Sequence, residues 1–195
     1  MLMFGRRNIT FLLGLLVAIG LLIVIVTMLF SHSKNQTKNP AQQPMAAYAV
    51  NPSAKVSLLI DGPTNAESLH NQVQITVSNS SATINVYSGY LGTLLRTETY
   101  PNNEPAFHVF LRSLEYAGFN DGVNDPKLAQ ASGYCPLQDR YIMSFSVNNV
   151  QKQRYWTTGC GSGVPETFKG DLNMTLQLFS NQIPDYQQVT SGLDI

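Results

Sequence analysis

The chain has 195 residues, of which only 12% are charged, and its 12 basic side chains balance its 12 acidic ones. This length accommodates one domain with attachments. No cluster of Lys and Arg follows the N-terminal region, so we set nucleic-acid binding aside, because it requires a basic stripe.

The strongest signal is an uncharged apolar run of 22 residues at positions 9–30, "ITFLLGLLVAIGLLIVIVTMLF". A helix of this length spans about 33 Å at about 1.5 Å per residue, enough for a hydrocarbon core of about 30 Å. The run is too long for a typical signal peptide, which predicts a retained signal-anchor and a single-pass membrane protein. Arg6 and Arg7, in the arm at 1–8, predict a cytoplasmic N-terminus and an extracytoplasmic C-terminal domain by the positive-inside rule.

Residues 31–54 are polar and rich in Asn, Gln and Pro at their start, and this composition predicts a flexible linker. The pattern becomes globular at about Lys55, so we expect the extracytoplasmic domain to occupy residues 55–195.

Four segments in the first half of this domain are typical of β-strands. Apolar residues alternate with polar ones, the period of a half-buried strand, and turn residues such as Asn79-Ser80-Ser81 separate the segments. Short connections predict consecutive antiparallel strands. The segments are "KVSLLID" (55–61), "QVQITVS" (72–78), "TINVYSG" (83–89) and "TLLRTETY" (93–100).

The second half combines helices with a further hairpin. Apolar spacing predicts a helix over 104–117, with Asn103 as its cap and Gly118 ending it. A hairpin follows at 140–147 and 151–158, and a second helix at 171–183. The order predicts an α+β fold, a mostly antiparallel sheet with two helices packed on one face.

The two cysteines, Cys135 and Cys160, lie just outside the two ends of the second hairpin. Antiparallel pairing brings these ends together, and an oxidising compartment favours a disulfide between them. Such a bond closes a loop of about 26 residues and stabilises by roughly 3 kcal/mol in the chain-entropy model. The cysteines lack the spacing of a zinc site, and no metal or cofactor is implied.

An alternative reading makes Cys160 a nucleophile. "TTGC" at a strand end resembles the cysteine motif of sortases, anchored extracytoplasmic transpeptidases that also use a histidine and a later arginine. His70 or His108 would be the histidine, but Arg154, the last arginine, precedes Cys160, so the family pattern is broken. His108 lies in a charged helical row with Glu104, Arg112 and Glu115, which is typical of a solvated helix face with weak ion pairs.

Tyr155 and Trp156 are adjacent on the last predicted strand, so their rings point to opposite faces. Either one ring is exposed and forms a partner surface, or both rings fill a second small core beneath the segment 120–133. Aromatic side chains are enriched in the cores of interfaces, which makes this pair the candidate contact site.

The stretch "GYCPLQDRYIMSFSVNNVQKQRYWTTGCG", followed by "LFSNQIPDYQQVTSG", resembles uncharacterised single-pass membrane proteins of ultra-small bacteria of the Saccharibacteria kind. The resemblance implies a bacterial protein facing the envelope and brings no catalytic residue. We therefore expect a membrane-anchored domain of the cell envelope that binds an unknown envelope or surface partner without catalysis. The alternative is an anchored thiol-dependent enzyme or hydrolase that uses Cys160 and His108.

Overall fold

The computed structural model describes residues 19, 43–161, 163–193 and 195, and the chain divides into two units, Met1–Gln42 and Gln43–Ile195. The predicted anchor at 9–30 lies, apart from Ile19, outside the described residues. Among the residues that the structure describes, no helix is both long and apolar enough to span a bilayer. The remaining description concerns the second unit.

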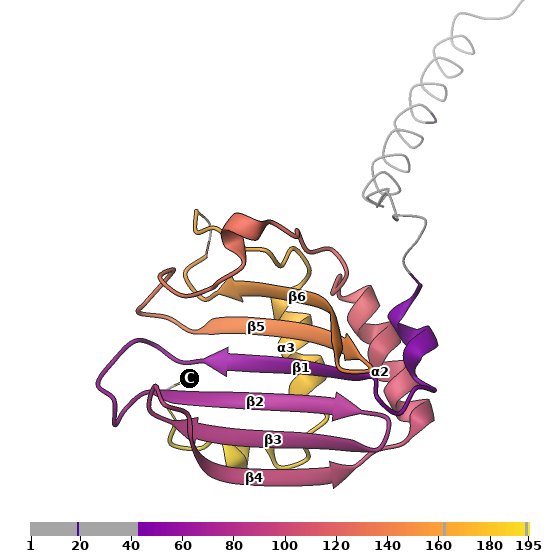
Figure 1. Cartoon of the computed structure of the whole chain (residues 1–195), viewed down its shortest axis with the longest axis horizontal. Coiled ribbons are helices and arrows are strands. Elements are labelled where there is room, and N and C mark those ends of the chain that lie inside the picture. The colour runs from indigo at the N-terminus through magenta and orange to yellow at the C-terminus, as the bar shows by residue number, and fades with distance from the viewer. Residues whose placement is uncertain (1–18, 20–42, 162, 194) are drawn as a thin grey trace, which may run out of the picture. The chain divides into compact units, whose positions relative to one another are not determined.

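A six-stranded, wholly antiparallel sheet forms one layer of this unit (Figure 1). Its strand order is β4-β3-β2-β1-β5-β6, so β1 pairs both with its chain neighbour β2 and with β5 from the second hairpin. The strands are β1 (Lys55–Asp61), β2 (Asn71–Ser78), β3 (Ser81–Ser88), β4 (Thr93–Pro101), β5 (Arg140–Val147) and β6 (Val150–Thr158). All six predicted strands are confirmed, and burial alternates along β1, β2 and β3 as the pleat requires, whereas the edge strand β4 is exposed almost throughout.

Two longer helices, α2 (Glu104–Tyr116) and α3 (Leu172–Ser180), pack on one face of the sheet. Phe110 of α2 and Phe179 of α3 meet edge to face at 5.3 Å, so the two helices share one core. The shared core contains side chains from five strands, among them Leu58, Ile75 and Met143. The α+β prediction is confirmed for this unit.

The predicted starts of both helices and the predicted end of the first are also observed. Asn103 accepts a hydrogen bond from the Ala106 amide at 3.0 Å, and Asp171 accepts one from Met174 at 2.9 Å. Gly118 has φ +81°, the left-handed conformation that glycine adopts without strain, and the Phe119 amide donates to the Leu114 carbonyl. The second helix ends at Ser180, three residues before the expected end, and a short helix α4 (Tyr186–Val189) follows.

The domain begins earlier than the sequence predicts. The short 3-10 helix η1 (Met45–Tyr48) packs on α2, and the Met45 amide donates to Oε1 of Glu115. Met45, Ala49 and Ala54 are buried in the core. The flexible linker predicted for 31–54 therefore does not include these residues, whose apolar side chains are too widely spaced to form a periodic pattern.

Candidate functional site

The two cysteines form a disulfide, as predicted, with their Cα atoms 5.9 Å apart. The register places Arg140 opposite Thr158, which brings the segments just outside the two strands together. Cys135 adopts a positive φ of 51° and is buried. Among the described residues there is no free cysteine, so neither sulfur is a thiol available for nucleophilic attack.

Tyr155 and Trp156 are both buried, 9% and 0% exposed, so the prediction of an exposed aromatic partner surface is wrong. The pair does point to opposite faces. Tyr155 packs against Phe119 on the helix side, and the Trp156 ring stacks on Tyr134 at 5.2 Å. The Trp156 Nε1 donates to the Leu128 carbonyl at 2.6 Å.

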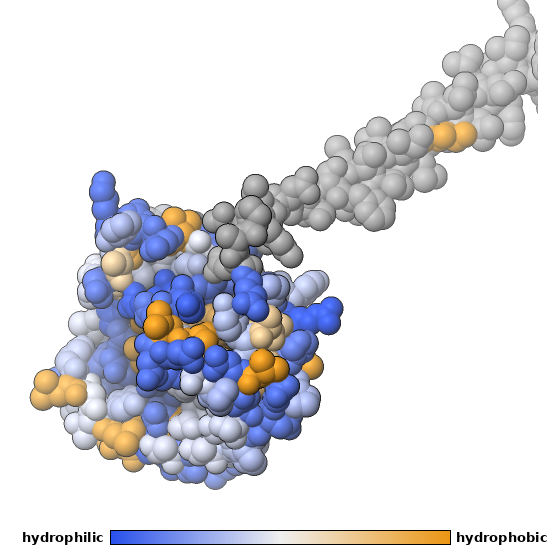
Figure 2. Space-filling model, turned by 45° about the vertical axis from the view of Figure 1, so that its right-hand side comes forward, coloured by the Kyte–Doolittle hydropathy of each residue, from blue (hydrophilic) through white to orange (hydrophobic). Residues whose placement is uncertain are grey.

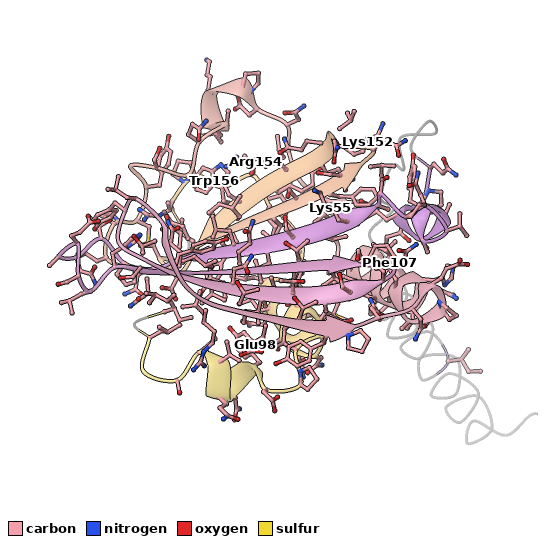
Figure 3. All side chains as sticks on the ribbon, turned by 60° about the horizontal axis from the view of Figure 1, so that its bottom comes forward. Lys55, Glu98, Phe107, Lys152, Arg154 and Trp156 are labelled. Carbon is pink, nitrogen blue, oxygen red and sulfur yellow. A yellow bond between two sulfur atoms is a disulfide. The ribbon has the colours of Figure 1, made fainter. Side chains whose placement is uncertain are left out.

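The reason for this burial is that both faces of the sheet are covered at β6. The segment 120–134 contains the short 3-10 helix η2 (Pro126–Leu128) and folds over the face opposite the helices. Arg154, which lies beside Trp156 on β6 (Figure 3), donates to the Ala129 carbonyl of the same segment at 2.7 Å. The second of the two sequence alternatives is observed in part, because Trp156 lies in a small core beneath this segment, whereas Tyr155 belongs to the main core on the helix side.

His108 is exposed on α2. Figure 1 shows this helix towards the end of the sheet opposite the start of β5 and the end of β6, next to which the disulfide lies. Glu104 and Arg112 on the same row are exposed as well, and Glu115 receives the hydrogen bond from Met45. The row is therefore a solvated helix face, one member of which anchors η1. The structure does not bring His108 and Cys160 together.

A charged cluster that the sequence analysis missed lies where β1 ends and β5 begins. Oδ2 of Asp61 accepts from Nε and Nη2 of Arg140 at 2.8 and 2.7 Å. Its Oδ1 accepts from Nε2 of Gln72 at 2.9 Å and lies 3.1 Å from Nε2 of His70. The signal in the sequence was a carboxylate ending one apolar strand and an arginine beginning another, but their pairing was not predictable.

The cluster holds the loop between β1 and β2 rather than presenting a reactive group. The second ring nitrogen of His70, Nδ1, lies 3.1 Å from the Pro63 carbonyl, and the ring stacks on Tyr90 at 4.1 Å. His70 is 1% exposed, so both its nitrogens are occupied inside the protein and neither faces a substrate. The described residues contain no group of three or more His, Cys, Asp or Glu side chains arranged to hold a metal ion.

A crevice of about 280 Å³ lies on the helix side, between the sheet and the C-terminal segment. Its floor is apolar, and its rim includes Tyr141, whose hydroxyl donates to Oδ2 of Asp139 at 3.2 Å. Burial, and then the Asp139 carboxylate, raise the pKa of Tyr141 to about 12, and the same two causes raise the pKa of Tyr186. Ligand pockets typically measure about 300–1,000 Å³, so this crevice is a weak candidate.

The other face of the sheet, which the helices leave uncovered, is the larger candidate surface, and we call it the open face. Hydroxyl and amide side chains lie on it across the five strands from β4 to β5, together with the apolar Leu59, Tyr87 and Ile142 and the cation Lys55. Its polar residues include Ser57, Gln74, Thr76, Thr83, Asn85, Thr97, Thr99 and Ser144.

Five hydroxyls on the open face form one row across five adjacent strands, from Thr99 through Thr83, Thr76 and Ser57 to Ser144. Neighbouring strands lie about 4.8 Å apart, which fixes the spacing along this row. Ser57 and Ser144 bring their Oγ atoms to 2.8 Å, and Thr83 and Thr99 bring their Oγ1 atoms to 3.2 Å. In Figure 2 the visible surface is mostly hydrophilic, with apolar side chains in small separate groups.

The class that the geometry defines is a disulfide-bonded, two-layer α+β domain with an open polar sheet face. No protein-family model matches the chain, and a search of the curated proteins found no significant match.

Proposed function

We propose that the chain is a single-pass protein of the bacterial cell envelope, anchored by residues 9–30, whose C-terminal α+β domain lies outside the membrane and binds a partner without catalysis. The disulfide between Cys135 and Cys160 carries this proposal. Disulfides persist in oxidising compartments and are rare in the cytosol, which agrees with the orientation that Arg6 and Arg7 favour. The resemblance to single-pass proteins of Saccharibacteria supports a bacterial envelope.

Binding is favoured over catalysis by the state of the candidate reactive groups. Cys160 is bonded to Cys135, and His70 is buried with both nitrogens occupied. His108 is exposed on α2, away from the disulfide. General acid-base or nucleophilic catalysis requires such groups to lie within hydrogen-bond distance of one another or of a substrate.

The open face is the contact surface in this proposal, and its chemistry suits a neutral, hydroxyl-rich polymer of the cell surface. Its row of hydroxyls provides donors and acceptors at a regular spacing across five strands. The one strong charge pair on this face, Asp61 with Arg140, is satisfied internally. Lys55 on β1 and Arg154 opposite Ser144 on β6 add positive charge beside the row, but the row itself is neutral and therefore matches the hydroxyls of an extended glycan better than a highly charged ligand.

Cosedimentation of the purified full chain with isolated envelope polysaccharide tests this function. Thr76→Lys and Ser57→Lys each place a long charged side chain in the middle of the hydroxyl row, so both variants should bind several-fold less polymer. Val109→Lys is the matched control, because it adds the same side chain at an exposed position of α2. Equal binding by all three variants would exclude the open face, and no sedimentation of the wild type would exclude the polymer.

A further inference from the structure

The two edges of the sheet differ in how they are closed. At β6, the backbone of Trp156 bonds to the segment that follows the disulfide, with its carbonyl accepting from the amides of Thr167 and Phe168 at 3.0 Å. The Trp156 amide also donates to Oγ1 of Thr167 at 2.8 Å. Within the described part of the chain, β4 pairs with β3 alone, so its outer edge is open.

The side chains of β4 are exposed on both faces from Thr93 to Thr99. Leu94 and Leu95 are 54% and 59% exposed on this open sheet edge. An exposed edge with apolar side chains is a template for pairing with another strand. Figure 3 shows Glu98 on this strand, at the opposite edge of the sheet from Arg154 on β6.

The charged side chains of β4 are placed so that two antiparallel copies of this strand would set opposite charges against each other. Arg96 lies opposite Val86 and Glu98 lies opposite Ile84, so both charged side chains point to the helix side of the sheet. Neither makes a salt bridge to another described residue. A two-fold axis through Thr97 would place Arg96 of each copy opposite Glu98 of the other.

We propose that β4 pairs antiparallel with β4 of a second copy of this chain, centred on Thr97, and joins the two sheets into one. The surface is isologous, since the same strand contributes both sides of the contact. The charges also select the register. Shifting the centre to Arg96 sets two arginines opposite each other, and shifting it to Glu98 sets two glutamates opposite each other, which is unfavourable for directly paired residues.

Site-specific crosslinking of the full chain in membranes tests this pairing. Thr97→Cys places two thiols across the axis, where paired Cβ atoms lie about 4.5–5.5 Å apart, so a short bis-maleimide should yield a covalent dimer. The native cysteines are disulfide-bonded and do not react with maleimide. Val109→Cys, exposed on α2, is the control for random collision.

Charge exchange in the Thr97→Cys background tests the register. Arg96→Glu or Glu98→Arg alone should weaken association roughly tenfold, which corresponds to about 1.4 kcal/mol, because each sets like charges opposite each other twice. The double exchange Arg96→Glu/Glu98→Arg should restore the dimer, which also shows that the single variants did not fail through misfolding. Crosslinking no greater than that of Val109→Cys, or no recovery in the double exchange, overturns the proposal.

Discussion

Asp61 and Arg140 lie directly opposite each other on β1 and β5, and two nitrogens of the guanidinium contact the same carboxylate oxygen at 2.8 and 2.7 Å. Their side chains are 18% and 9% exposed, so the pair is largely withdrawn from solvent. The contact joins the first hairpin of the chain to the second. It also fixes the carboxylate that Gln72 approaches from β2 and His70 from the loop just before β2.

Removal of this guanidinium should destabilise the domain strongly. We expect Arg140→Met to lower the free energy of unfolding by about 3 kcal/mol, because it leaves a mostly buried carboxylate without its cation. Arg154→Met is the matched control and should cost about 1 kcal/mol, since its guanidinium donates one hydrogen bond at an exposed site. Urea unfolding followed by circular dichroism measures both values, and equal losses would contradict a special role for the pair.

Replacement of either cysteine should lower the free energy of unfolding by the same amount, because either change removes the disulfide. Cys135→Ser and Cys160→Ser should each lower the free energy of unfolding by about 2–5 kcal/mol, because the bond limits the freedom of the unfolded chain. The double variant should match either single variant, since one bond is lost in all three. Thiol titration of the unfolded wild type without reductant should detect no free thiol, and a double variant as stable as wild type would exclude a structural role.

The tight packing of Tyr155 on Gly122 gives a third prediction. A methyl group at Gly122 would collide with the Tyr155 ring, so Gly122→Ala should destabilise the domain by about 1–3 kcal/mol. Tyr155→Leu should abolish most of this penalty, although it is destabilising itself. A double-mutant cycle on the unfolding free energies measures the coupling, and additive effects would show that the ring is not the cause.

Alkaline pH should reveal the environment of Tyr141. Its pKa is raised to about 12 in the folded protein, against 10.0 for an ordinary tyrosine. Between these pH values the folded state retains a proton that the unfolded state loses, so the free energy of unfolding falls as the pH rises. Tyr141→Phe removes this titration and should show a smaller fall over that interval.

Urea unfolding at a series of pH values from 9 to 12 makes the comparison. Tyr116→Phe is the control and should behave like the wild type, because this ring is 84% exposed. The pKa values of Tyr155 and Tyr186 are also raised, chiefly by burial. The free energy of unfolding of the Tyr141→Phe variant should therefore still decrease with rising pH, but less than that of the wild type. Identical pH profiles for all three proteins would show that Tyr141 does not contribute.

The proposed topology predicts that the C-terminus lies outside the cytoplasmic membrane. Arg6 and Arg7 are the only charged residues before the apolar run, and they should keep the N-terminal arm inside. An alkaline phosphatase fused after Ile195 should therefore be active, whereas a reporter that requires the cytoplasm should be inactive at the same position. The reverse result would contradict both the orientation and the oxidising compartment.

The sequence by itself determined the strands and the capped helix ends. Alternation of apolar residues reports directly which side of a strand is buried, so segments such as 72–78 could be assigned from local pattern alone. The caps at Asn103 and Asp171 are equally local, because the side chain bonds to an amide three residues further on. The disulfide was predictable because the hairpin that pairs its two cysteines is itself local.

Only the tertiary structure decided whether the aromatic pair is exposed and which residues meet in the charged cluster. Tyr155 and Trp156 are both buried because separate segments cover the two faces of β6, and no local pattern shows which faces are covered. Asp61 and Arg140 are 79 positions apart and meet because β1 pairs with β5 across the middle of the sheet. Strand order depends on the packing of the whole core, whereas the period of each strand depends only on its own residues.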